Sequence, residues 1–186
     1  MAKTAGTARA RAPSLDGMRV SFVRTGERRY EVRVERDLAT DLVMSPAPGW
    51  SALAPHDLVH LVVEHRFGLR DGIFGQIAAG GNAGTFVPTQ EPRTKAWARR
   101  VERRNQSRGT QIGRSEQLAA AVYPAWLRHR GMTPDLHQAR AEETTADLGP
   151  RELAAAFADL DRLSAAWSGL AVGESLDVDW PWPERR

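Results

Sequence analysis

One stretch constrains the fold more than any other, because residues 55–65 combine a helical apolar pattern with chemically active side chains. At about 100° per residue, four polar groups project within an arc of about 100° around a helix axis. They are His56, Asp57, His60 and Glu64. The opposite arc is apolar and consists of Leu58, Val59, Leu61, Val62 and Val63. The segment is therefore predicted to be an amphipathic helix with a polar face suited to chemistry.

Two regions far apart in the sequence predict a small antiparallel sheet. Apolar and polar residues alternate over residues 18–24 and again over 30–35, on either side of a loop that contains Gly26, which indicates a hairpin. Alternation returns at residues 175–180, and this late strand is expected to join the hairpin.

Between these regions the pattern is mainly helical. After the polar-faced segment, short or long helices are expected over residues 71–79, 93–108, 115–130 and 150–168, separated by glycine-containing breaks. The fold class predicted is α+β, with a small antiparallel sheet from about 18–35 and 175–180 and a helical layer over about 54–168.

Length and composition narrow the remaining possibilities. A chain of 186 residues suits a single α+β domain over 17–186, preceded by a basic tail over 1–16 that is predicted to be disordered. Cysteine is absent, which excludes disulfides, thiolate nucleophiles and cysteine zinc ligands. No apolar run approaches the roughly 20 residues of a membrane span, and a cytoplasmic location is expected.

The two histidines of the polar face predict a metal site. His56 and His60 are spaced i,i+4, which suits one divalent cation, and Glu64 adds a carboxylate one turn further. The prediction is a metal-dependent or acid–base enzyme for a small-molecule substrate, with His56, His60 and Glu64 as ligands and zinc as the expected metal. Asp57 is then a base or an orienting group, and Glu64 is a second catalytic candidate. The alternative is a solvated polar stripe without chemistry.

A longer motif adds to this prediction. Residues 56–60 read His-Asp-Leu-Val-His, and residues 68–75 read Gly-Leu-Arg-Asp-Gly-Ile-Phe-Gly. This region, about 20 residues, resembles the zinc motif of a ubiquinone-biosynthesis family that carries His-Asp-x-x-His and a downstream glutamate; it is also similar to uncharacterised bacterial proteins. The resemblance implies a metal at His56 and His60. It departs from the family pattern at Gly72, where the glutamate is expected, and Glu64 is the candidate replacement.

A basic helix offers a different function. Residues 93–108 contain many arginines and one acid within the helix, Glu102. Guanidinium groups pair well with phosphate, so the alternative prediction is a non-enzymatic protein that binds nucleic acid or another phosphate-bearing polyanion. The residues expected to do so are Arg99, Arg100, Arg103 and Arg104.

Two further expectations concern the surroundings of the polar face. Gly68 ends the first helix, so residues 71–79 and the loop 80–86 are expected to fold back over that face. His137 is a candidate third ligand, although nothing in its spacing indicates that it approaches His56 and His60.

Overall fold

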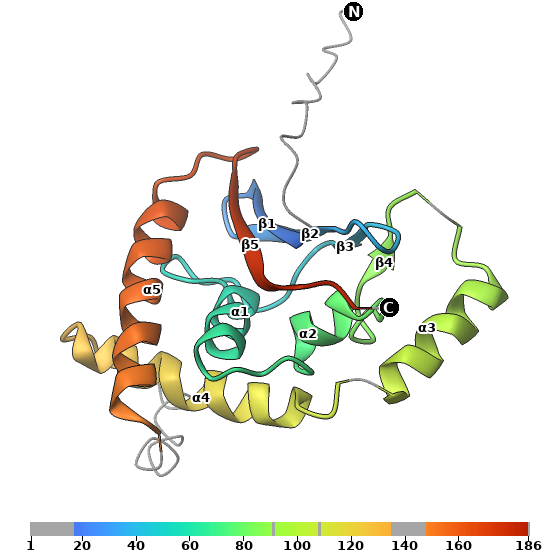
Figure 1. Cartoon of the computed structure of the whole chain (residues 1–186). Coiled ribbons are helices and arrows are strands. Elements are labelled where there is room, and N and C mark those ends of the chain that lie inside the picture. Colours follow the sequence, from blue (N-terminus) through green and yellow to red (C-terminus); the bar gives the residue numbers. More distant parts are fainter. Residues whose placement is uncertain (1–16, 91, 108, 135–147, 186) are drawn as a thin grey trace, which may run out of the picture.

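The computed structural model describes residues 17–90, 92–107, 109–134 and 148–185 (Figure 1). The predicted tail over 1–16 and the candidate ligand His137 lie outside these residues.

A sheet of five antiparallel strands forms one layer, in the spatial order β4-β3-β2-β1-β5. Its strands are β1 (Gly17–Gly26), β2 (Arg29–Glu35), β3 (Leu42–Met44), β4 (Val87–Pro88) and β5 (Ser175–Pro183). The predicted hairpin and the late strand are therefore confirmed. The strands β3 and β4 are additions, since two or three residues are too few to carry a period-2 pattern.

The register of the sheet explains its alternating sequence. Val20 of β1 lies opposite Val34 of β2 and Val178 of β5, so the apolar residues of three strands share one face. Successive side chains of a strand point to opposite faces, and the buried face of β1 and β2 packs on the helices. The edge strand β5 also extends past the predicted 175–180, and its two prolines, Pro181 and Pro183, are tolerated at the free edge of the sheet.

Five helices form the rest of the described fold. They are α1 (His56–Arg66), α2 (Ile73–Ala78), α3 (Lys95–Ser107), α4 (Ile112–His129) and α5 (Pro150–Ser168). In Figure 1, α1 lies between the sheet and α4, with α5 on one flank and α2 on the other. The arrangement confirms the α+β class.

The helix α1 is buried almost all round. Residues 57–64 are all buried. They include the apolar arc and three of the four polar residues, because α4 packs against this part of α1, whereas His56 at the start of the helix is exposed. His60 and Glu64 are fully buried, so the interpretation of a solvated stripe is wrong for these two residues. Buried polar groups need partners, and the identity of those partners determines what this face can do.

No helix in the described ranges has the length and hydrophobicity needed to cross a bilayer.

Candidate metal centre

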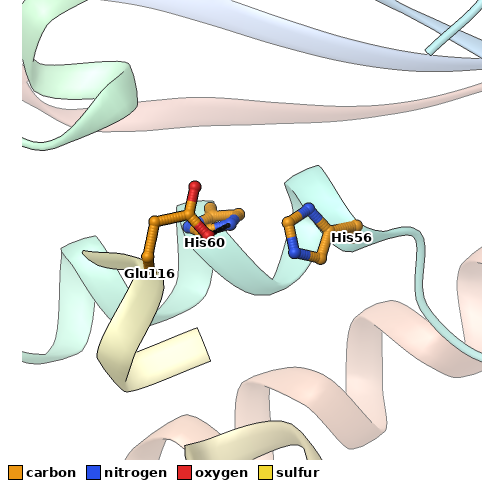
Figure 2. A group of neighbouring side chains, drawn as sticks. All are labelled: His56, His60 and Glu116. Atoms are coloured by element: carbon orange, nitrogen blue, oxygen red, sulfur yellow. Dashed lines mark ion pairs between the residues drawn. The ribbon is translucent and has the colours of Figure 1, made fainter. Parts of the chain in front are cut away.

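Three side chains from two helices converge on one point. His56 and His60 come from α1 and Glu116 comes from the first turns of α4 (Figure 2). Each offers one ligand atom, and these atoms lie within 4.8 Å of one another. The two imidazole rings are edge-to-face, with centroids 4.5 Å apart. The predicted histidine pair is therefore present, with a carboxylate that is not Glu64.

Hydrogen bonds behind His60 define the orientation of its ring. Nδ1 of His60 lies 2.9 Å from Oγ of Ser115, and that hydroxyl lies 2.8 Å from Oε1 of Glu64. A hydroxyl has one proton, and when Glu64 is ionised Ser115 donates it to the carboxylate and accepts from Nδ1–H of His60. In the neutral ring, Nε2 of His60 then carries the lone pair, which is the form that binds a metal.

The other nitrogen of His60 faces the cluster without a hydrogen bond. Nε2 is buried, has no hydrogen-bond partner among the described residues, and lies 3.4 Å from Oε2 of Glu116. A lone pair on Nε2 and a carboxylate oxygen repel each other at this separation. Either Nε2 carries a proton that points at Glu116, or a cation lies between the two atoms.

Glu64, the predicted third ligand, is engaged elsewhere. Its carboxylate is fully buried and accepts backbone N–H groups of Ile73 at 2.6 Å, Phe74 at 2.9 Å and Gly75 at 3.3 Å. These donors belong to the start of α2, so α2 does fold back onto α1, as expected, but it covers only the Glu64 end. The prediction that Glu64 ligates a metal is corrected: it lies behind His60, one hydroxyl away.

Burial and packing set the properties of Glu64. Burial raises its pKa to about 7, against the opposing effect of hydrogen bonds from Ser115 and Ile73. Gly72 leaves room for it, because a Cβ at this position would lie 2.4 Å from Cδ of Glu64 and displace the carboxylate. The carboxylate of Glu64 therefore occupies the space into which a side chain at position 72 would project.

Asp57, the predicted base, points away from the cluster. Its Oδ2 lies 2.6 Å from the hydroxyl of Tyr30 on β2, and that hydroxyl also contacts the carbonyl of Pro48. Burial raises the pKa of Asp57, and the hydrogen bond with Tyr30 opposes the rise. Asp57 thus joins α1 to the sheet and is not among the three converging groups.

A cleft of about 710 Å³ opens beside the cluster. His56 and Glu116 stand in its wall, and Glu116 has 54% of its side chain exposed. Partial burial and the neighbouring His60 lower the pKa of His56, which favours its neutral form. Contact with His60 lowers the pKa of Glu116, which favours its carboxylate. The rest of the lining is mainly apolar and consists of Arg28, Gly49, Trp50, Ser51, Ala52, Ala54, Val59, Ala119, Ala120, Tyr123 and Pro124.

The loop before α1 fits closely against His56. Gly49 has a φ of +70°, and a Cβ there would lie 2.5 Å from Cβ of His56. Its carbonyl accepts the backbone N–H of His56 at 3.1 Å. Glycine is the residue that tolerates both this conformation and this approach, so the position of His56 depends on it.

The four arginines predicted to bind a polyanion do not form one strip. Arg99, Arg100 and Arg103 are exposed on α3, but Arg104 turns inward and donates from Nη1 to the carbonyl of Ala79 at 2.9 Å. Arg99 and Arg103 border one shallow surface hollow, while Arg100 and Arg104 line a separate pocket. Polyanion binding stays a prediction.

Ser115 and Glu116 are site residues that the sequence patterns did not indicate. They lie 55 and 56 positions after His60, and no local spacing connects them with it. One signal was available: Ser115 shares a helical face with Leu118 and Val122, which places a polar side chain among core residues.

Comparison with protein-family models, curated proteins and solved structures finds no significant match for this chain.

Proposed function

We propose that this protein binds a divalent metal ion through His56, His60 and Glu116 and is a metal-dependent enzyme for a small molecule held in the adjacent cleft. One observation carries the proposal: in the part of the chain that the structure describes, Nε2 of His60 is buried without a hydrogen-bond partner and faces a carboxylate oxygen 3.4 Å away. Buried polar atoms are rarely left without partners, and a cation satisfies both groups at once.

The composition of the cluster favours zinc in a catalytic setting. Two imidazoles and one carboxylate are a ligand set of catalytic zinc sites, in which the fourth position is left for water or substrate. His56 and Glu116 both border the cleft, so a fourth position would open toward it. A metal bound there would polarise a substrate oxygen or lower the pKa of a bound water.

The hydrogen bonds on the other side of the His60 ring also support a bound metal. A metal-ligating histidine usually donates its second N–H to an oxygen that is itself held in place. The chain from His60 through Ser115 to Glu64 has this form, and three backbone N–H groups hold its far end.

The resemblance of residues 56–75 to the ubiquinone-biosynthesis family supports a metal at the two histidines. The glutamate of the family pattern would stand at position 72, where this chain has glycine. Because the carboxylate of Glu64 lies against the position of a Cβ at Gly72, we propose that Glu64 supplies the acidic group of this region and acts behind the metal.

Metal analysis tests the binding half of the proposal. Protein purified without a histidine tag should hold close to one metal per chain, and zinc should return after chelation. His56→Ala and Glu116→Gln change residues on the cleft wall and leave the core packed, and each should weaken zinc binding by more than about 100-fold, beyond the loss usual for an outer partner. His129→Ala, which removes an exposed histidine of α4, should bind as the wild type does. Unchanged affinity in both site variants would remove the proposal.

A cleft-filling variant tests the catalytic half. Ala52 is exposed on the cleft wall and lies outside the two helices that carry the ligands, so Ala52→Trp should fill part of the cleft and leave the three ligands in place. Zinc-loaded wild type should hydrolyse at least one compound in a panel of small esters, amides and phosphoesters, and Ala52→Trp should keep the metal and lose that activity. Metal binding with no activity that depends on the cleft would indicate a structural ion instead.

A further inference from the structure

A second pocket, lined by arginines, lies between α3 and two connecting segments of the fold. It encloses about 160 Å³ and is bordered by the β2–β3 connection, the α2–β4 connection and one face of α3. Three of its residues are Arg36, Arg100 and Arg104, and no aspartate or glutamate of the described chain lines it. The other lining residues are Leu38, Ala39, Thr40, Gly80, Trp97 and Val101.

Arg36 places a positive charge at the inner side of this pocket. Its residue is 7% exposed, and its guanidinium donates to backbone carbonyls: Nε to Thr40 at 2.8 Å, and Nη1 to Ile77 at 3.1 Å and Gly81 at 3.0 Å. Carbonyls hold a guanidinium in position but do not neutralise its charge. Within the described residues, no carboxylate lies within the 4.0 Å of an ion pair.

The acidic groups nearest to Arg36 are already occupied. Oδ1 of Asp41 accepts the backbone N–H of Arg36, and the carboxylate of Glu184 accepts the N–H groups of Asp37 and Leu38. They favour the charged form of Arg36 from a distance, but burial outweighs them and lowers its pKa to about 10.

Arg104 adds a second positive charge, and a backbone carbonyl also holds its guanidinium group. Its Nη1 donates to the carbonyl of Ala79 at 2.9 Å, and within the described residues this bond occupies one of its five N–H donors. Gly80 makes this approach possible, because a Cβ there would lie 2.0 Å from Nη1 of Arg104. The charge of Arg104 also lowers the pKa of Arg36, so the two guanidinium groups repel each other across the pocket.

We propose that this pocket binds the phosphate group of a small molecule through Arg100 and Arg104, with Arg36 as the fixed positive charge behind them. A guanidinium presents parallel N–H donors that match two phosphate oxygens, and backbone carbonyls hold Arg36 and Arg104 before any ligand arrives. An anion would relieve the repulsion between Arg36 and Arg104. The enclosed volume suits one phosphate group and not a folded polyanion. This site is independent of the metal centre.

Calorimetric titration with inorganic phosphate and with glycerol phosphate, at constant ionic strength, tests the pocket. Saturable binding with a Kd below about 1 mM is expected for at least one of the two. Tighter binding of glycerol phosphate would identify a phosphoester as the ligand, whereas tighter binding of inorganic phosphate would identify the free ion. Absence of saturable binding for both would overturn the proposal.

Matched variants separate the pocket from general attraction to a basic surface. Arg104→Gln and Arg100→Gln each remove one pocket charge, and each should weaken phosphate binding by about tenfold or more, as expected for a lost charge-assisted hydrogen bond. Arg99→Gln removes the same charge from the exposed outer surface of α3 and should leave the Kd within about twofold. Equal weakening in all three variants would show that attraction is unspecific and would refute the site. Because Arg100 is exposed, Arg100→Gln keeps the test decisive if Arg104→Gln fails to fold.

Discussion

His56 and Glu64 lie two turns apart on the same face of α1, yet their environments differ completely. At the His56 end, the loop before α1 and the middle of α4 leave a cleft of about 710 Å³. At the Glu64 end, the start of α2 closes over the carboxylate with three backbone N–H groups. The His56 end of this polar face is therefore open to the cleft (the open end), and the Glu64 end is covered by α2 (the sealed end).

The difference shows that the covering element, not the stripe itself, determines what a polar residue on α1 does. His60 stands between the two ends and takes part in both, through Nε2 toward Glu116 and through Nδ1 toward Ser115 and Glu64. Three predictions test this contrast between the two ends.

The largest effect is expected from truncating the two glutamates. Glu64→Ala leaves three backbone N–H groups and the hydroxyl of Ser115 without their acceptor in the core, which should lower the free energy of unfolding by about 3–5 kcal/mol. Glu116→Ala removes a side chain that is 54% exposed, and it should change metal-free stability by less than about 1 kcal/mol while abolishing metal binding. Urea denaturation of the metal-free proteins measures both. Comparable destabilisation by the two variants would contradict the contrast.

The sealed end should also make stability depend on pH. Burial raises the pKa of Glu64 from 4.5 to about 7. The unfolded chain releases this proton near the lower value and the folded chain retains it up to the higher one. The free energy of unfolding should therefore fall as the pH rises through this interval and become level above it, with a contribution of about 3 kcal/mol from Glu64.

Urea denaturation of metal-free wild type and Glu64→Gln from about pH 4.5 to about pH 8 measures this contribution. The amide cannot titrate, so the stability difference between the two proteins should shrink or reverse as the pH rises. Glu102→Gln, at an exposed position of α3, serves as the control and should follow the wild type. Parallel curves for wild type and Glu64→Gln would show that Glu64 keeps an ordinary pKa.

The smallest effect is expected where the two ends meet. Ser115→Ala removes the hydroxyl between His60 and Glu64 and leaves all three proposed ligands in place. Zinc affinity should fall by about 10–100-fold, the usual cost of losing an outer partner of a metal-ligating histidine. Ser164→Ala removes a second buried hydroxyl, which belongs to α5, and should leave zinc affinity unchanged. Wild-type affinity in Ser115→Ala would show that the open end does not depend on the sealed one.

Several elements of the fold could be predicted because their signals are local. The hairpin of β1 and β2, the strand β5 and the helices α1 and α5 have regular periods over seven or more residues. The short strands β3 and β4 could not, since pairing with β2 makes them strands and their own sequence carries little pattern. Tertiary pairing outweighs local preference in such segments.

The sequence by itself determined that His56 and His60 share one face of a helix, because an i,i+4 spacing brings two side chains together wherever that helix lies. Only the tertiary structure decided which carboxylate joins them. Glu64 is on the same face but meets the start of α2, whereas Glu116 is 56 positions from His60 and arrives with α4. The physical reason is that helix periodicity fixes directions around one axis, while the partners of a buried polar group are set by packing between segments distant in sequence.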